Sequence, residues 1–383
     1  MISNSRSTKA QRVGRCSRTD LFRSICQNTE VWTMLKNQQD GSTMDFWIDE
    51  CDGLCKASEV GHTFIVNTLL SAGARSIFDS NNPQVFGDGA YLSREQEIKP
   101  PLWFASTNGH TEVVRSLLVG NKRTLYYSVK EKRKQIFIAI LGVTNLDHCV
   151  EDHFEIFDLL LRELEGKGSD STTNNVELLS HALLLSAKHG HASLVKSLLN
   201  AGASIEFIYV KRDNVIEDEI DLISYGCDHD DTVGKTALHL AVQYNHLDVA
   251  NLLIENEAAV NCSTKEEFNT GQFPLELAYI SKNHEMLKLL AESGANLNQE
   301  LRDGDGLTIL MHAAKYGKLE VVRILASAGA DLELESNHYI HSTYDIVLRG
   351  RTAFMFAKEE GHKDVMLCLF HEAAKRRSDG GCT

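Results

Sequence analysis

Apolar residues recur along the chain at three- and four-residue steps, in short runs that end at glycine or polar residues. In the stretch 305–333, for example, Val321, Val322 and Leu325 fall on one side of a helix and are flanked by charged residues. This spacing predicts a short amphipathic helix with one buried face. A second short apolar segment precedes it, so the pattern predicts pairs of helices joined by tight turns.

The helix-pair pattern repeats along most of the chain. Ala241, Ala278 and Ala314 hold the same place in three successive copies and are 37 and 36 residues apart. The clearest copies are 53–74, 100–118, 181–206, 231–254, 270–298, 305–333 and 350–370. Two weaker copies are 21–36, an expected entry unit, and 136–164, which is interrupted at 143–152. One helix pair cannot bury its apolar face alone, so the copies are expected to stack into a continuous core.

These copies resemble the ankyrin repeat, whose pattern is Gly-x-Thr-Pro-Leu-His-x-Ala-Ala, then Gly-His, a Val- and Leu-rich second helix and Gly-Ala. The stretch 231–254 fits through Gly234, Thr236, Leu238, His239, Ala241, His246, Val249, Leu252 and Leu253. The resemblance covers about 300 residues. It implies an all-α ankyrin-repeat solenoid of about eight to nine helix-turn-helix units. It also implies that the histidines of the Gly-His position, His62, His110, His191, His246 and His362, bond neighbouring loops.

The domain organisation follows from where the pattern stops. We expect a single solenoid over residues 19–374, a basic, disordered tail at 1–18 and a disordered tail at 375–383. Long insertions are expected near 75–98, 119–135, 207–231 and 334–349. The insertion 207–231 mixes apolar and acidic residues, so it either packs on the solenoid or extends as a partner-binding finger.

Composition excludes several classes of protein. The 383 residues carry a formal charge of −14, which argues against a broad nucleic-acid surface. No apolar run reaches the ~18 residues of a membrane helix, so membrane insertion is not expected. The nine cysteines are scattered without a CxxC pair, which favours reduced thiols. We expect a monomer in the cytoplasm, with the nucleus as the alternative location.

Gly234, Lys235 and Thr236 raise the question of a phosphate-binding loop. Such a loop needs Gly-x4-Gly-Lys-Ser/Thr, because the first glycine lets backbone amides curl round the phosphates. His229 stands in that glycine's place, and Asp228, Asp230 and Asp231 around it would repel phosphate. The sequence therefore favours a turn and helix start here, and no cofactor is expected.

Histidines and cysteines are the candidates for metal binding and nucleophilic catalysis. His189 with His191, or His229 beside its aspartates, could supply metal ligands, but the repeat pattern accounts for most of the histidines. Neither a Gly-x-Ser-x-Gly nor a His-Glu-x-x-His motif occurs. A cysteine paired with a distant histidine is the remaining catalytic alternative. We therefore assign no catalytic, cofactor or metal residue and expect a non-enzyme.

The resemblance implies a protein–protein interaction scaffold or adaptor whose partner binds the concave face of the array. In that family the face is built from turn tips and from exposed positions of the first helices. Carried over by position, the candidate partner-binding residues are Lys188, His189, Gln243, Tyr244, Ile280, Ser281, Lys315 and Tyr316. Local burial of these side chains is the alternative interpretation.

Two other functions stay open at this point. One is a host-directed effector of a bacterium or intracellular parasite, and the other is a targeting subunit of a separate enzyme.

Overall fold

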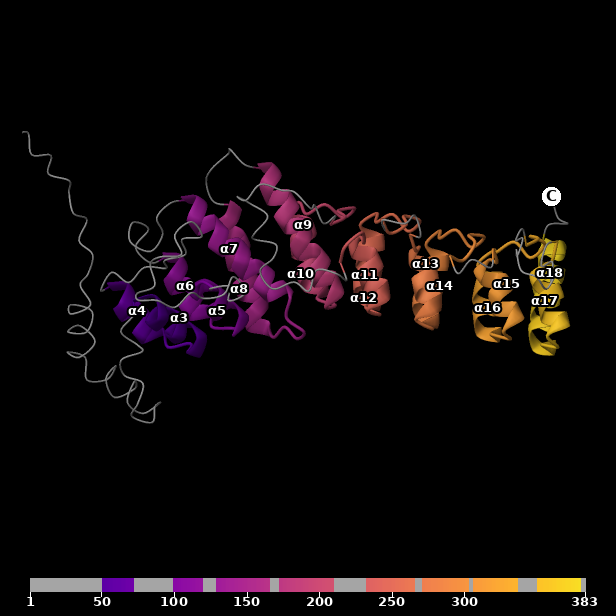
Figure 1. Ribbon diagram of the computed structural model, residues 1–383, viewed down its shortest axis with the longest axis horizontal. Helices are drawn as coiled ribbons and strands as arrows, with labels where there is room; N and C mark the ends of the chain where they lie inside the picture. The colour runs from indigo at the N-terminus through magenta and orange to yellow at the C-terminus, as the bar shows by residue number, and fades with distance from the viewer. Residues whose placement is uncertain are drawn as a thin grey trace, which may run out of the picture. The chain divides into compact units, whose positions relative to one another are not determined.

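The computed structural model is an array of helix pairs (Figure 1). It describes residues 50–71, 99–119, 129–165, 172–209, 232–265, 271–302, 306–336 and 350–379. These residues contain eight helix pairs and, besides helices, two isolated β-bridges, Tyr209 with Val233 and Glu300 with Thr308. The chain divides into two units, Met1–Ser169 and Asp170–Thr383, and each is considered by itself. The all-α fold expected from the pattern is confirmed.

Several expected segments lie outside the described residues. They are the tail 1–18, the entry unit 21–36, the insertion 75–98 and the main parts of the other insertions, 120–128, 210–231 and 337–349.

The first unit contains three helix pairs. They are α3 (Glu50–Val60) with α4 (Thr63–Ser71), α5 (Pro101–Thr107) with α6 (Thr111–Val119), and α7 (Val129–Thr144) with α8 (Glu151–Glu165). First helices contact first helices and second helices contact second helices. Helix α7 begins at Val129, inside the expected insertion 119–135, so the inserted part is shorter than expected. The interrupted copy 136–164 is a helix pair, and its interruption is the turn between α7 and α8.

The second unit contains five helix pairs. They are α9 (Thr172–Lys188) with α10 (Ala192–Asn200), α11 (Ala237–Gln243) with α12 (Leu247–Glu255), α13 (Pro274–Ile280) with α14 (His284–Glu292), α15 (Ile309–Lys315) with α16 (Leu319–Ser327), and α17 (Ala353–Glu359) with α18 (Lys363–Asp379). Helix α18 continues past residue 374, so the expected disordered tail 375–383 is corrected as far as Asp379. Arg376 holds this last turn in place by donating to the carbonyl of Ala330 at 2.8 Å.

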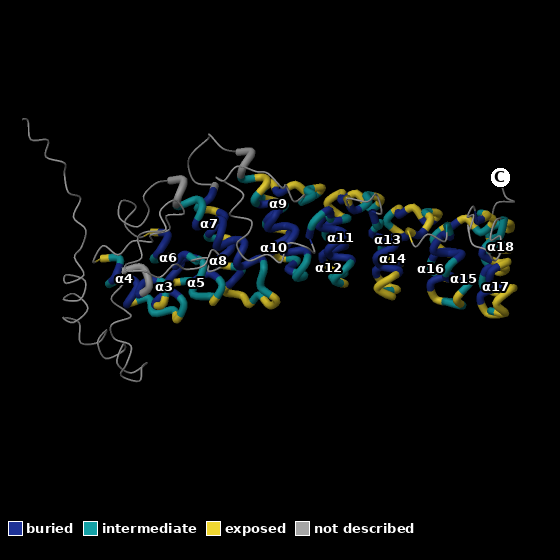
Figure 2. Tube along the Cα trace, viewed as in Figure 1, coloured by how far each residue is buried: buried dark blue, intermediate teal, exposed yellow. Residues whose placement is uncertain are grey.

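Apolar burial between the pairs forms the core of each unit. Figure 2 shows buried residues in the middle of the helices and exposed residues concentrated at the turns. Ala241, Ala278 and Ala314 are at most 1% exposed, so these small side chains of the first helices belong to the packed core. Burying each Val or Leu of the second helices contributes about 1.5–3 kcal/mol.

A glycine in one pair and a histidine in the next form a repeated contact. The Nε2–H groups of His110, His246 and His362 donate to the carbonyls of Glu59, Lys188 and Lys315 at 3.0, 2.8 and 3.1 Å. Each imidazole ring thereby lies over the glycine that ends the first helix of the preceding pair. A Cβ atom at Gly61 would be 2.6 Å from the ring of His110, and one at Gly317 would be 2.7 Å from that of His362. The bonds implied by the resemblance are therefore present for these three histidines.

A fourth contact of this kind was not anticipated from the sequence. His153, in the first turn of α8, donates from Nε2 to the carbonyl of Thr107 at 3.1 Å and lies beside Gly109. It falls outside any Gly-His dipeptide, so the motif did not identify it.

The glycine–histidine contact is replaced at two successive junctions of the second unit. Asn245 and Lys282 occupy the glycine positions with φ of 66° and 57°, and Asn283 and Lys318 occupy the following histidine positions. Wherever the histidine is absent, a residue with a Cβ atom is tolerated at the glycine position. The two positions therefore form one structural unit.

The start of α11 depends on a buried histidine. Thr236 caps the helix, and His239 accepts from the Thr236 N–H at Nδ1 (3.3 Å) and bonds the Gln272 carbonyl through Nε2 (3.2 Å). The bond at Nδ1 requires the neutral ring, because a protonated Nδ1 cannot accept. Burial lowers the pKa of His239 from 6.5 to about 4.

Replacing Gly317 with alanine should destabilise the protein more than the same change at Gly294. Both glycines have positive φ, at 67° and 87°, but a Cβ meets His362 only at Gly317, since nothing lies within 4 Å of Gly294. We expect Gly317→Ala to cost about 2–3 kcal/mol and Gly294→Ala about 1 kcal/mol. Urea unfolding measures both, and equal costs would contradict the steric role of His362.

Replacing Lys282 with glycine should stabilise the protein. A lysine at φ 57° is strained by about 1–2 kcal/mol, and the entropy that glycine adds to the unfolded chain offsets part of the relief. We expect a gain of about 0.5–1 kcal/mol in urea unfolding. The matched control is Lys288→Gly in the interior of α14, which should cost about 1 kcal/mol. A loss in both variants would refute the strain at Lys282.

Acidification should destabilise the protein through His239. The unfolded histidine binds its proton near pH 6.5 and the folded one near pH 4, so stability is retained above 6.5 and falls as the pH drops towards 4. The loss should be about 3 kcal/mol. The measurement compares the pH dependence of urea unfolding with that of His239→Gln, in which every other titrating group is kept. Parallel curves between pH 6.5 and 4 would contradict the assignment.

Candidate functional site

The eight candidate residues lie at the same end of four successive first helices of the second unit. Lys188, Gln243, Ile280 and Lys315 are the last residues of α9, α11, α13 and α15, and His189, Tyr244, Ser281 and Tyr316 directly follow them. We call this set the first-helix surface. Each of these helices ends where the glycine position reverses the chain, so the sequence pattern itself sets the spacing of the candidates.

Apolar and aromatic groups are accessible on the first-helix surface. Ile280 and Tyr316 are each 55% exposed, and Tyr244 is half-buried. Lysines accompany the tyrosines: the Nζ of Lys188 lies 5.7 Å from the centre of the Tyr244 ring, and that of Lys315 lies 5.5 Å from the Tyr316 ring. Ammonium groups over aromatic faces are weakly attracted and hold the rings in place. Local burial, the alternative interpretation, does not apply to Ile280 or Tyr316.

Three residues that the sequence reasoning missed support Tyr316. The Tyr279 hydroxyl lies 2.6 Å from Nδ1 of His312, and Lys318 donates to the same hydroxyl at 2.8 Å. The His312 ring in turn lies 4.5 Å from that of Tyr316. Tyr279 is on α13 and His312 on α15, so the cluster links two neighbouring pairs. In the sequence, the signal for this cluster is Lys318, which stands where the repeat pattern has a histidine.

Lysine charge gathers beside this cluster. Burial lowers the pKa of Lys318, and the positive charge of Lys282 lowers it further. Two ammonium groups thus lie near one another at the end of α13 and the start of α16. A negatively charged group of a binding partner would relieve their repulsion.

The Gly234-Lys235-Thr236 stretch is a turn followed by a helix cap. The Gly234 N–H donates to the Tyr209 carbonyl at 2.8 Å, and its carbonyl accepts from the Lys265 N–H at 2.7 Å. Thr236 is the N-cap of α11. The Gly234 amide is therefore not free to bind a phosphate.

Among the described cysteines, Cys262 lies close to a histidine. Its Sγ lies 3.9 Å from Nδ1 of His239, but that nitrogen already accepts from the Thr236 N–H. Burial raises the pKa of the Cys262 thiol, and it raises that of Cys149 to about 11. A thiol needs a lowered pKa to act as a nucleophile, so neither environment activates its cysteine.

The described part of the chain offers neither a metal cluster nor a membrane span. Within it no group of three or more His, Cys, Asp or Glu side chains could hold a metal ion. The candidate His229 and its aspartates fall outside it, while His189 and His191 stack on each other with ring centres 6.1 Å apart. No described helix is long and apolar enough to cross a bilayer.

The structure describes the first three residues of the insertion 207–231. Phe207 and Tyr209 both meet His181 of α9 edge-on, with ring centres 4.9 and 4.6 Å away. Tyr209 then pairs with Val233, and residues 210–231 are not described. The start of the insertion therefore packs on the second unit.

Comparison with known proteins finds relatives in nematodes and viruses. The chain is 26% identical over 349 residues to the ankyrin repeat and KH domain-containing protein mask-1 of Caenorhabditis elegans, an alignment that covers 84% of this chain and 11% of that protein. It is 35% identical over 122 residues to ankyrin repeat protein FPV031 of fowlpox virus, an alignment that covers 28% of this chain and 36% of that protein. It is 32% identical over 136 residues to the transient receptor potential cation channel subfamily A member 1 homolog of Caenorhabditis elegans. This alignment covers 35% of this chain and 10% of that protein.

The chain thus spans only a minor part of each of these relatives, whose names describe different proteins. A family model described as "Ankyrin repeats (3 copies)" matches residues 149–301 and 298–379, more than half of the chain. Such repeats are in general non-catalytic protein–protein interaction modules. The chain belongs to the ankyrin-repeat family.

Proposed function

We propose that this protein is a non-catalytic interaction scaffold or adaptor that binds a protein partner on the first-helix surface. The observation that carries the proposal is the run of Tyr244, Ile280 and Tyr316 on three successive helix pairs, with Ile280 and Tyr316 more than half exposed. Tyrosines are enriched among the residues that dominate binding energy at protein interfaces. Their rigid rings also lose little conformational entropy when a partner binds.

The part of the partner that contacts the first-helix surface carries negative charge. Lys188 and Lys315 flank the tyrosines, and Lys282 is near enough to Lys318 to lower its pKa. Carboxylates of the partner would meet these ammonium groups, while an apolar side chain packs between Ile280 and Tyr316. Opposite charges set the rate and specificity of association, and the buried apolar and aromatic contacts supply most of the affinity.

The non-catalytic part of the proposal rests on the site chemistry. The polar groups near the first-helix surface bond one another in fixed pairs, as Tyr279 does with His312 and Lys318. Cys262 lies in an environment that keeps its thiol protonated. Binding by shape, aromatic contact and charge needs none of these groups to react.

The double variant Tyr244→Ala and Tyr316→Ala should abolish partner binding without unfolding the protein. Both side chains lie just beyond helix ends rather than in the core, so the melting temperature should fall by only a few degrees. Affinity capture from the native cells, with quantitative mass spectrometry, measures the recovered partner. Recovery should drop at least about ten-fold, because truncating an interface tyrosine commonly costs about 2 kcal/mol or more.

The matched control is Glu320→Ala with Arg323→Ala, two exposed residues of α16 outside the first-helix surface. This control should recover the partner at the level of the unmodified protein. Full recovery with the tyrosine variant, or equal loss with the control, would rule out the first-helix surface as the binding site.

A further inference from the structure

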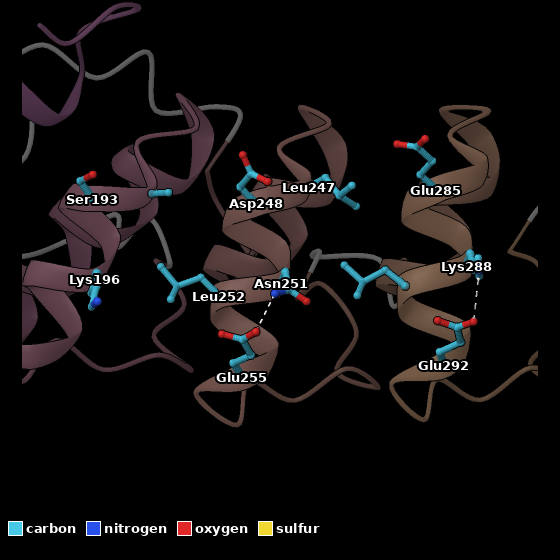
Figure 3. Close-up of a pocket in the computed structure, with 12 residues that line it drawn as sticks. Ser193, Lys196, Leu247, Asp248, Asn251, Leu252, Glu255, Glu285, Lys288 and Glu292 are labelled. Carbon is cyan, nitrogen blue, oxygen red and sulfur yellow. Dashed lines mark hydrogen bonds and ion pairs between the residues drawn. The ribbon is translucent and has the colours of Figure 1, made fainter.

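A groove of about 820 Å³ lies on the second helices α10, α12 and α14 (Figure 3). It has a structural cause. Helices α12 and α14 come close to each other at fewer residues than α11 and α13 do, so the second helices are more widely separated here. Side chains between them are left uncovered. The groove belongs to the second helices and contains none of the first-helix surface residues.

The floor of the groove is made of leucines. Leu247 and Leu252 of α12 and Leu289 of α14 line it and are only partly buried, in contrast with the fully buried Leu253 and Leu290 beside them. In Figure 3 Leu252 points towards α10 and Leu247 towards α14. An apolar side chain of a partner could therefore contact this floor on either side of α12.

The rim of the groove carries four exposed carboxylates. Asp248 and Glu255 lie seven residues apart on α12, and Glu285 and Glu292 lie seven residues apart on α14. Seven residues are two helical turns, or about 10 Å along each helix. Glu255 accepts from Asn251 at 2.7 Å, and Glu292 is 3.8 Å from Lys288. Among the described residues Asp248 and Glu285 have no ion-pair partner.

This arrangement is particular to α12 and α14. On α10 the two equivalent positions hold Ser193 and Asn200. On α16 they hold Glu320 and Ser327. The doubled carboxylates are thus not required by the repeat, since neighbouring pairs stack without them. They coincide with the place where the second helices are more widely separated.

We propose that this groove binds a basic segment of a second protein partner. The segment carries two Lys or Arg side chains about two helical turns apart, which meet carboxylates at both ends of the groove. Between them an apolar side chain packs on the leucine floor. The four carboxylates outnumber Lys196 and Lys288, the two ammonium groups that line the groove, so its charge complements a basic occupant and not an acidic one.

The test is fluorescence anisotropy of the full chain with a defined probe. The probe is a fluorescein-labelled helical peptide with lysines two turns apart and leucines between them, and the control peptide has glutamates in place of the lysines. The lysine peptide should bind more weakly as salt is raised, because the charge contacts are exposed. The glutamate peptide should not bind. Absence of lysine-peptide binding at low salt would overturn the proposal.

Two groove variants locate the site. Asp248→Asn with Glu285→Gln, and separately Glu255→Gln with Glu292→Gln, should each weaken lysine-peptide binding about ten-fold. The second pair lies at helix C-termini, where removing negative charge favours the helix dipole, so loss of folding cannot explain its effect. The matched control is Glu320→Gln with Glu333→Gln, which removes the same charge from exposed positions outside the groove and should change binding less than two-fold.

Two outcomes would overturn this assignment. Equal weakening by the control variant would mean general attraction to an acidic protein. Weakening by Tyr244→Ala with Tyr316→Ala, without weakening by the groove variants, would place the peptide on the first-helix surface.

Discussion

Every helix pair in this chain depends on its neighbours to bury its apolar face. No pair is large enough to enclose a core of its own, so stability arises at the junctions between pairs. The small residues Ala241, Ala278 and Ala314 are buried in the first helices, and the glycine–histidine contacts fix the turns between first and second helices. Because each junction is local, one can change without disturbing those further along the array.

The pair formed by α13 and α14 packs differently against its two neighbours. On one side α13 packs closely against α11, while α14 is more widely separated from α12. On the other side α14 packs against α16, and Tyr279 of α13 bonds His312 of α15 and Lys318 at the start of α16. Both proposed binding surfaces adjoin this pair. The first-helix surface carries lysines and tyrosines, and the groove carries carboxylates over leucines. The protein would thus hold two partners of opposite charge on one short part of the array.

Much of the fold could be predicted from the sequence because the same physical requirement recurs. The three- and four-residue spacing of Val and Leu sets the helices, and the glycines mark where the chain must take positive φ. The start of α7 at Val129 could not be predicted, since that helix begins in a polar, basic stretch without the repeat pattern. The extension of α18 to Asp379 depends on Arg376 reaching a carbonyl 46 residues away, which local pattern does not encode.

The candidate site was predictable in position and not in detail. Counting back from the glycine position located Ile280 and Tyr316 at exposed helix ends. It could not locate Tyr279, His312 or Lys318, because their bonds join residues 33 and 39 positions apart in sequence. The groove could not be predicted from the sequence either, since it arises from the wider separation of α12 and α14 and not from any one residue type.

The paired glycine and histidine positions also constrain how such an array can change over generations. A histidine introduced at Lys318 while Lys282 is still present would bring its ring against a Cβ atom, as the spacing at Gly317 and His362 indicates. A glycine introduced first at Lys282 meets no such obstacle. The order of the two substitutions therefore matters. A junction that lacks both the glycine and the histidine can regain their contact if the glycine is introduced first, but not if the histidine is.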